Sequence, residues 1–195
     1  MQNKGLPVQK DAMQEMLILV NKDDKPIGAD TKLRVHQLGM LHRAFSLFIF
    51  DEQGRFMLQQ RAACKYHSAG LWSNTCCGHP RQGETLGSAA HRRLQEEMGF
   101  DCPLQEVATL TYRSPLSNDL IEHEYDHILV GHYNRAPTPN PSEAAAWQWL
   151  EETTIAAQLR SQPQRYTIWF QTIFQQTPSA EFKRWQAVAS AAAQS

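Results

Sequence analysis

Two carboxylates close together in the chain have a spacing that suits a divalent metal ion. Glu122 and Glu124 are two residues apart in an extended segment, so their side chains point to one face of the predicted strand and His123 points to the other. Carboxylate oxygens are hard ligands that Mg²⁺ and similar ions accept. The spacing can therefore place both carboxylates on one metal ion.

A second group of carboxylates brackets a predicted helix. Glu96 and Glu97 lie at its end, and Glu84 lies in the loop before it. A fold that brings loop and helix together offers oxygen ligands to Mg²⁺, which in turn bridges diphosphate oxygens. The alternative for Arg92 and Glu96, which are four residues apart, is a solvated surface ion pair that contributes little.

The thiols indicate a reducing environment. The chain has four cysteines, two of them adjacent at Cys76 and Cys77, and this is not the pattern of a disulfide framework. We therefore expect free thiols and a cytoplasmic protein. A single cysteine is more often inert packing than a reactive group. Lone histidines are more often surface or core residues than ligands, and five are assigned to that default: His67, His91, His123, His127 and His132.

The predicted elements that position these groups are a sheet and several helices. Two apolar runs at residues 44–50 and 56–61 flank a turn and predict a hairpin. Further strands are expected at 16–20, 107–113, 124–133 and 147–150, with an irregular stretch from the turn after residue 20 through residue 40. Apolar residues recur every four positions from Thr85 to Met98 and Gly99 follows, which predicts a helix. Helices are also expected from about residues 151 and 166, before a frayed alanine-rich tail.

Length and composition indicate one domain without a charged partner surface. The 195 residues, 42% of them hydrophobic, supply one core, so we expect a single domain over residues 1–195 with a peripheral N-terminal dozen and C-terminal tail. Nearly equal numbers of Lys+Arg and Asp+Glu, 19 and 20, give no field that would attract nucleic acid or an anionic membrane. The N-terminal apolar run is too short for a signal-peptide core or a membrane span. A small molecule is the expected partner.

The segment from Gly78 to Phe100 resembles the Nudix box, G-x5-E-x7-R-E-U-x-E-E-x-G-U, where U is apolar. It matches at every fixed position except Arg93, where the family has Glu. The resemblance implies an α/β fold, the Nudix-type α/β/α sandwich built on a mixed β-sheet.

Four further motifs resemble type I isopentenyl-diphosphate isomerases within the Nudix families. They lie at residues 41–46, 58–61, 74–80 and 122–124, and the resemblance runs from about Met16 to Phe174. It implies interconversion of isopentenyl and dimethylallyl diphosphate for isoprenoid synthesis. This reaction adds a proton at the terminal carbon and removes one from an allylic carbon, which requires an acid and a base on opposite faces of the substrate.

The resemblance assigns that pair to Cys77 and Glu124, and it gives Cys76 no catalytic role. Tyr112 is expected to place a hydroxyl near Glu124. Because the reaction passes through a tertiary carbocation, an aromatic ring is expected to stabilise it by cation–π attraction, and Trp169 is the candidate.

The same resemblance implies two metal sites. It adds three histidines to the Glu122 and Glu124 pair and suits a six-coordinate Mn²⁺ or Mg²⁺, whereas Zn²⁺, a further candidate, usually takes fewer ligands. Glu97 is expected to hold the Mg²⁺ that bridges the diphosphate. The implied histidine ligands are His36, His42 and His79.

The resemblance also implies four cations that hold the diphosphate: Lys32, Arg61, Lys65 and Arg93. Arg61 ends a predicted strand and Lys65 follows in the loop, so both can reach one anion, and guanidinium groups suit bidentate phosphate contacts. Arg93 replaces a glutamate that a hydrolase would use near its metal, which favours holding the diphosphate over cleaving it.

Two alternatives use the same fold. A Nudix pyrophosphohydrolase acting on a nucleoside diphosphate derivative is the first, because fold alone does not decide chemistry. Cys77, the pair of Glu122 and Glu124, and Arg93 argue against it. A non-catalytic Nudix-like binding module is the second, but it would be expected to lose box carboxylates, and Glu84, Glu96 and Glu97 are all present.

Overall fold

The computed structural model describes residues 14–65, 67–116 and 118–194. The N-terminal dozen residues, expected to be peripheral, lie outside this part of the chain. The strands are β1 (Met16–Val20), β2 (Pro26–Thr31), β3 (His42–Phe50), β4 (Phe56–Arg61), β5 (Trp72–Ser73), β6 (Cys76–Gly78), β7 (Leu104–Pro115), β8 (Ile121–His132) and β9 (Ala144–Leu150). The helices are α2 (Lys32–Leu38), α3 (Leu86–Met98), α4 (Glu152–Ser161), the 3₁₀ turn η1 (Pro163–Arg165), α5 (Ile168–Gln176) and α6 (Ser179–Ala192).

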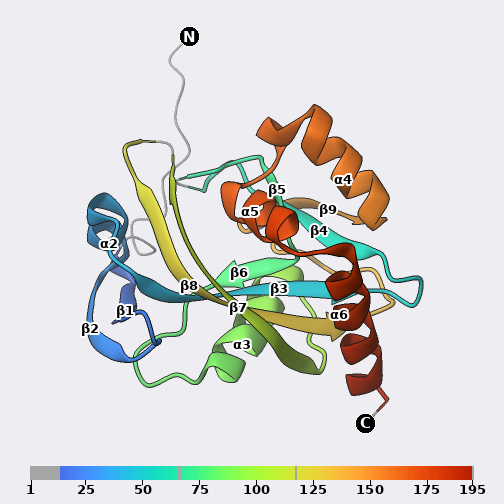
Figure 1. Cartoon of the computed structure of the whole chain (residues 1–195), viewed down its shortest axis with the longest axis horizontal. Coiled ribbons are helices and arrows are strands. Elements are labelled where there is room, and N and C mark those ends of the chain that lie inside the picture. The colour runs from blue at the N-terminus through green and yellow to red at the C-terminus, as the bar shows by residue number, and fades with distance from the viewer. Residues whose placement is uncertain (1–13, 66, 117, 195) are drawn as a thin grey trace.

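Strand β3 is the centre of a mixed sheet (Figure 1). β8 pairs with it in parallel along its whole length, while β1, β6 and β4 pair with it antiparallel. β7 then pairs with β8, and β9 with β4. Parallel neighbours require a long crossover connection, and the chain between β3 and β8 supplies it and includes α3.

Alternation of side chains along β3 creates a core on each face of the sheet. Phe45, Leu47 and Ile49 pack with α3 in one core, and Phe48 and Phe50 pack with α4, α5 and α6 in the other. Figure 1 shows α3 on one side of β3 and β8, with α4 and α5 on the other. The predicted α/β/α sandwich is therefore confirmed.

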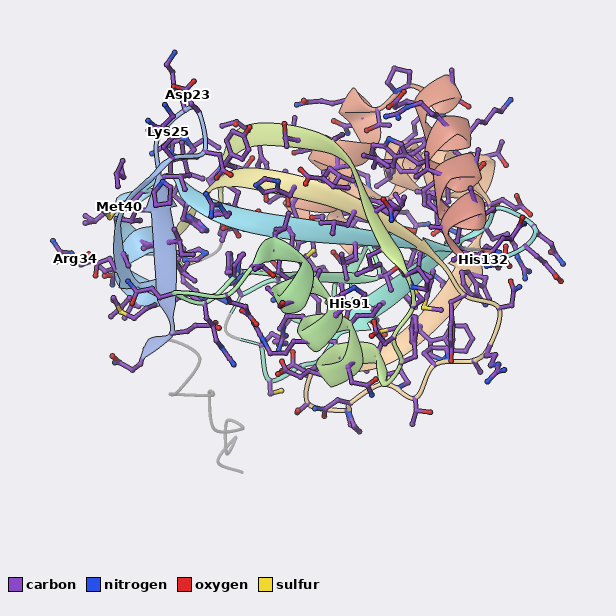
Figure 2. The ribbon with its side chains drawn as sticks, turned by 90° about the horizontal axis from the view of Figure 1, so that it is seen from below. Asp23, Lys25, Arg34, Met40, His91 and His132 are labelled. Atoms are coloured by element: carbon purple, nitrogen blue, oxygen red, sulfur yellow. The ribbon has the colours of Figure 1, made fainter. Side chains whose placement is uncertain are left out.

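A smaller unit of β1, β2 and α2 packs at one end of the sheet. Leu17, Leu19 and Val35 form its core. Figure 2 shows this end, marked by Asp23, opposite the end marked by His132. The unit carries two of the predicted site residues on α2, so its docking against β3 contributes directly to the site.

The hairpin of β3 and β4 and the helix α3 agree with the sequence prediction. The hairpin closes at Phe50 and Phe56. Thr85 is the N-cap of α3, where its hydroxyl accepts a hydrogen bond from the Ser88 amide, and Gly99 ends the helix with a φ of 73°. Both caps are the residue types that favour those positions.

The prediction of irregular structure through residue 40 is wrong, because β2 and α2 lie there. β2 is a mostly exposed edge strand without apolar alternation, and α2 has only 7 residues before Gly39 ends it at a φ of 61°. Neither is long enough to show a clear hydrophobic period. The alanine-rich segment, expected to fray, is helical to Ala192 and buries Ala189. No helix in the described part of the chain is long and apolar enough to span a membrane.

Candidate active site

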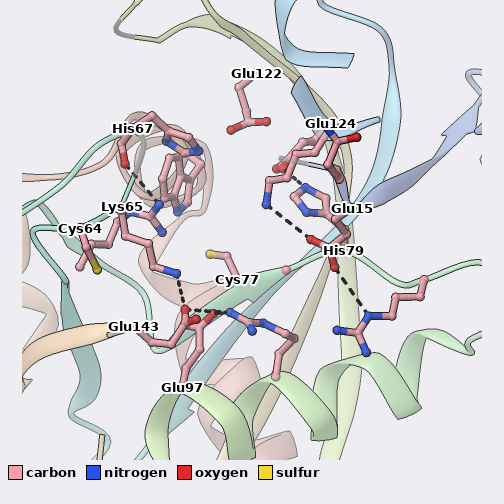
Figure 3. A pocket seen from close by; sticks show the side chains of 17 residues that line it. Glu15, Cys64, Lys65, His67, Cys77, His79, Glu97, Glu122, Glu124 and Glu143 are labelled. Carbon is pink, nitrogen blue, oxygen red and sulfur yellow. Dashed lines mark hydrogen bonds and ion pairs between the residues drawn. The ribbon is translucent and has the colours of Figure 1, made fainter. Parts of the chain in front are cut away.

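A cavity of ≈ 540 Å³ opens beside β6 and β8 (Figure 3). In Figure 3 the Cys77 thiol lies between Glu122 and Glu124 on one side and Glu97 and Glu143 on the other. The predicted site residues that line the cavity are Lys32, Arg61, Lys65, Cys77, His79, Arg93, Glu97, Glu122, Glu124 and Trp169. His36, His42 and Tyr112 lie behind its wall and contact lining residues.

Strand register sets the position of Glu124. It is the direct partner of His42 on β3 and of Tyr112 on β7, so all three side chains share one face of the sheet. The Tyr112 hydroxyl donates a hydrogen bond to Glu124 Oε2 at 2.6 Å. The predicted contact between this hydroxyl and Glu124 is present.

The predicted histidines and carboxylates form one buried cluster. His36 Nε2 lies 2.9 Å from Glu122 Oε1, His42 Nε2 lies 3.7 Å from Glu124 Oε1, and His79 Nε2 lies 3.1 Å from the same Glu124 atom. The ligand atoms of His42, His79, Glu122 and Glu124 all lie within 4.8 Å of one another. Nitrogen and oxygen donors at this separation can hold a divalent metal ion.

Two observations fit the cluster to a metal. The Nδ1 atoms of His36 and His42 lie 2.7 and 2.9 Å from the backbone carbonyls of Lys32 and Met40. A carbonyl only accepts, so each Nδ1 carries the proton and each Nε2 presents a lone pair to the cluster. Among the described residues, His42 Nε2 and Glu122 Oε1 are buried without a hydrogen-bond partner, a costly state that a bound cation would relieve.

The electrostatics keep His79 and Glu124 in forms that bind metal. Burial, with a contribution from Lys32, lowers the pKa of His79 to about 3, so this imidazole is neutral at ordinary pH. Burial raises the pKa of the Glu124 carboxyl, but its interactions with the His42 and His79 side chains outweigh this effect and hold the pKa well below its usual range. A neutral imidazole and an ionised carboxylate are the forms that coordinate a cation.

Cys77 and Cys76 point to opposite faces of β6. Cys76 is fully buried in the core against α3, which matches the packing role expected of it. The Cys77 thiol lies in the cavity, 3.1 Å from Asn74 Oδ1. The Asn74 amide nitrogen donates to the carbonyls of Leu47 and Cys76, so its oxygen is fixed to accept the thiol proton.

A serine and an aspartate lie behind this thiol. Ser46 Oγ is 3.6 Å from Cys77 Sγ and donates to Asp126 Oδ2 at 2.8 Å. Burial, reinforced by the charge of Asp126, raises the pKa of Cys77. The group therefore stays a neutral thiol that carries a transferable proton.

Trp169 is held at the cavity wall by its neighbours. Its Nε1 donates to Ser73 Oγ at 2.8 Å, and the Arg61 guanidinium carbon lies 5.2 Å from the ring centroid. His67 meets the same ring edge-on, with centroids 5.7 Å apart. The ring that lines the cavity is thus also in contact with Arg61 and His67.

Two of the predicted diphosphate ligands are ion-paired with carboxylates. Lys65 Nζ contacts Glu143 Oε2, and Arg93 Nη2 contacts both Glu97 Oε1 and Glu143 Oε2, the latter at 3.0 Å. Gln59 Nε2 donates to the other Glu97 oxygen at 2.7 Å. The proposed Mg²⁺ ligand Glu97 therefore lies beside the cations that are expected to hold the diphosphate.

The other box carboxylates do not join Glu97. Glu84 accepts two hydrogen bonds from Arg92, at 2.7 and 2.8 Å, and lines a separate surface hollow. Glu96 lies between Arg92 and Arg93 on the exposed side of α3. These three glutamates do not converge on one ion site, contrary to the expectation. The alternative, a surface ion pair between Arg92 and Glu96, is present.

Sequence reasoning missed several residues that meet the site. His67, which was expected to be a surface or core histidine, groups with His36 and Glu122 at metal-ligand distances. It is an isolated histidine in a loop, and nothing in the sequence distinguishes it from the other lone histidines. Glu143 follows a turn at Asn140, and only the folded chain brings that turn to Lys65.

The fold and the box define the class of protein. A family model described as the NUDIX domain matches residues 40–170. A crystal structure of a Deinococcus radiodurans protein superposes with a TM-score of 0.70 at 18% identity, covering 83% of this chain and 98% of the other. The MutT protein of Methanosarcina mazei gives a TM-score of 0.58 at 19% identity over 74% of this chain and 94% of the other. These similarities show a Nudix fold.

Curated relatives narrow the class. The isopentenyl-diphosphate Delta-isomerase of Serratia proteamaculans is 53% identical over 178 residues, covering 91% of this chain and 99% of the relative. Isopentenyl-diphosphate Delta-isomerase 2 of Photorhabdus laumondii is 51% identical over 89% of this chain and 98% of its own length. This chain belongs to the isopentenyl-diphosphate Delta-isomerase family and is an enzyme. Family membership favours an isomerase over the hydrolase that the box alone would allow.

Proposed function

We propose that this isomerase interconverts isopentenyl and dimethylallyl diphosphate with Cys77 and Glu124 as its acid/base pair. The observation that carries the proposal is their placement. β6 and β8 flank β3 on opposite edges, and the thiol of one and the carboxylate of the other face the same cavity. A five-carbon chain bound between them has a proton donor and a proton acceptor within reach.

The proton balance requires both groups. In one direction, one group donates a proton to the terminal carbon of the double bond, which leaves a tertiary carbocation, and the other removes a proton from the allylic carbon, which restores a double bond. The reverse direction exchanges the two roles. Asn74 orients the Cys77 thiol. The Tyr112 hydroxyl orients the Glu124 carboxylate through its hydrogen bond to Oε2.

The cavity wall protects the cationic intermediate. Trp169 is 4% exposed, and its ring can stabilise a carbocation by cation–π attraction while it excludes water. Its hydrogen bond to Ser73 fixes the plane of the ring. We assign this stabilising role to Trp169, with Arg61 contacting the part of the ring that the substrate does not use.

We assign Mn²⁺ or Mg²⁺, with Zn²⁺ as a further candidate, to His36, His42, His79, Glu122 and Glu124. A bound ion there would neutralise the two carboxylates and hold Glu124 at the substrate. A second ion, Mg²⁺ at Glu97, would offset the charge of the diphosphate, for which Lys32, Arg61, Lys65 and Arg93 supply the cationic contacts. Residues 1–195 then form a single catalytic domain that acts in the cytoplasm on a small diphosphate, without nucleic acid or membrane partners.

Proton NMR in deuterated buffer tests the acid/base assignment. Wild type with isopentenyl diphosphate and Mg²⁺ is expected to form dimethylallyl diphosphate that carries deuterium. Cys77→Ala and Glu124→Gln are each expected to slow this conversion by about 10²-fold or more, the lower range for loss of a general acid or base. Cys76→Ala is the matched control, because it removes the adjacent thiol from the core and leaves the cavity unchanged.

Two outcomes would contradict the proposal. Conversion by Cys77→Ala at the wild-type rate would remove the thiol from the mechanism. Hydrolysis of nucleoside diphosphate derivatives by a wild type that leaves isopentenyl diphosphate unchanged would favour the hydrolase alternative.

A further inference from the structure

Glu143 occupies the cations that a diphosphate would need. One carboxylate oxygen, Oε2, contacts Lys65 Nζ and accepts from Arg93 Nη2 at 3.0 Å. The residue is only 9% exposed and lines the cavity (Figure 3). A carboxylate oxygen and a phosphoryl oxygen use the same N–H donors. Glu143 therefore presents to these cations an anionic oxygen, as the diphosphate of a substrate would.

The backbone holds Glu143 in this place. Its amide donates to the Asn140 carbonyl, and its own carbonyl accepts from the Ala62 amide, each at 2.9 Å. The Asn140 amide in turn donates to the Glu97 carbonyl at the end of α3, also at 2.9 Å. The corner that carries Glu143 is therefore tied to β4 on one side and to α3 on the other.

The charges in the cavity make this contact significant. The cationic side chains that line it are Lys32, Arg61, Lys65, Arg81 and Arg93, and the carboxylates are Glu15, Glu97, Glu122, Glu124 and Glu143. The formal charges of these side chains, five of each sign, cancel. A free diphosphate anion thus meets cations that are already matched by carboxylates.

We propose that Glu143 holds the place of a phosphoryl oxygen in the empty site and is displaced when the diphosphate binds. The proposal rests on the proposed function, because it takes Lys65 and Arg93 as diphosphate ligands. The contact prevents unaccompanied anions from binding tightly. The released carboxylate lies beside Glu97, since both contact the same Arg93 nitrogen, and it is then available to the cation that accompanies the diphosphate.

Titration calorimetry with inorganic pyrophosphate in the presence of a chelator tests the displacement. Glu143→Gln keeps the shape of the side chain and removes its charge. We therefore expect metal-free pyrophosphate to bind at least about 10-fold more tightly than to wild type, because no carboxylate then competes for the two cations. Glu143→Asp withdraws the charge by one methylene and is expected to give a smaller gain in the same direction.

Two control variants separate displacement from a general effect of charge. Glu15→Gln removes the same charge from the same cavity, but the ion pairs of Glu15 within the described part of the chain are the longer ones with Lys32 and Arg81, at 3.9 and 3.7 Å. Glu96→Gln removes a partner of Arg93 that does not line the cavity. Both are expected to change the affinity by less than about 3-fold, as screened charges do.

The outcomes are distinct. The inference is overturned when Glu143→Gln binds pyrophosphate as wild type does, more weakly, or with a gain no larger than that of Glu15→Gln. Glu143 would then only position the cations or act through its charge. Circular dichroism and the NMR assay with Mg²⁺ identify a misfolded variant. Failure of wild type both to isomerise and to bind pyrophosphate with Mg²⁺ would instead reject the proposed function.

Discussion

At the scale of single residues, Cys76 and Cys77 show how adjacent identical side chains acquire different chemistry. Alternation along β6 sends Cys76 into the core and Cys77 into the cavity. Burial raises the pKa of both thiols. Neither is therefore an activated thiolate, and Cys77 is set apart by access and by the Asn74 oxygen that orients its proton.

This difference predicts the pattern of alkylation. In metal-free protein, iodoacetamide is expected to modify Cys77 more slowly than a free cysteine, with a rate that rises about tenfold per pH unit through pH 9, because only the thiolate reacts. Cys76 is expected to remain unmodified in folded protein. Peptide mass spectrometry after timed quenching measures both rates. Fast labelling of Cys77 at pH 7 would mean that its pKa is lowered.

The Glu84–Arg92 ion pair gives a second residue-scale prediction. Hydrogen bonds from Arg92 lower the pKa of Glu84 from 4.5 to about 2. A carboxyl with a depressed folded-state pKa stabilises the fold above its unfolded pKa, and that contribution declines as the pH falls from 4.5 towards 2.

A double-mutant cycle with Glu84→Gln and Arg92→Gln, read from free energies of unfolding, tests this pH range. The coupling is expected to be constant from pH 7 to pH 5 and to decrease at lower pH. Loss of the coupling already at pH 6, or no coupling at any pH, would show that the pair is solvated.

At the scale of elements, the end of α3 organises the diphosphate side of the cavity. Gly99 adopts a left-handed φ of 73°, and a Cβ there would lie 2.2 Å from the Thr138 carbonyl oxygen. The Thr138 amide donates to the Met98 carbonyl. The close approach thus binds the loop that leads to Glu143 to the helix that carries Glu97.

Gly99→Ala is expected to be strongly destabilising. The left-handed backbone costs an alanine about 1 to 2 kcal/mol, and the clash with Thr138 adds roughly 1 to 3 kcal/mol. Gly83→Ala is the control, since Gly83 has a φ of 78° but nothing within 4 Å of the added Cβ. Urea denaturation of both variants measures the difference, and equal losses would show that the loop moves aside without cost.

The elements also show which parts of this structure are visible in the sequence. α3 has an apolar repeat and two capping residues, so its bounds were predictable. β2 and α2 were missed because they are short and are held in place by β1. β2 pairs with it, and Val35 of α2 packs on Leu17 and Leu19, which are contacts between segments that no local pattern records. Local pattern therefore predicts an element only when the element contains its own signals.

The site follows the same rule. The motif at residues 74–80 and the pair Glu122 and Glu124 could be recognised because their spacing is local. Glu143 and His67 join the site through loops whose course depends on the folded sheet. Arg93 was expected to hold the diphosphate, and the structure adds Glu143 and Glu97 as its partners.

At the scale of the whole molecule, the cluster of histidines and glutamates proposed to hold a metal joins parts of the chain that are distant in sequence. His36 comes from α2, His42 from β3, His79 from the segment after β6, and both glutamates from β8. A ligand that binds only this assembled arrangement stabilises the fold by mass action.

Divalent metal is therefore expected to raise the melting temperature. Mn²⁺ at 100 times its dissociation constant adds about 2.7 kcal/mol, which corresponds to roughly 5 to 11 °C for a chain of this size. Differential scanning calorimetry with and without chelator measures the shift. Glu122→Gln is expected to reduce the shift, whereas His132→Ala, outside the cluster, is expected to preserve it; an equal reduction in both would indicate metal bound elsewhere.

The pairing of Glu124 with His42 has a consequence for how the chain folds. If β8 slipped by one residue against β3, both glutamates would turn to the α3 face and His123 would take their place. A metal ion would not be held by that arrangement. Bound metal would therefore stabilise the correct register between two strands that the chain pairs over a long crossover. Divalent metal added during refolding is expected to favour molecules with this register over molecules in which β8 has slipped.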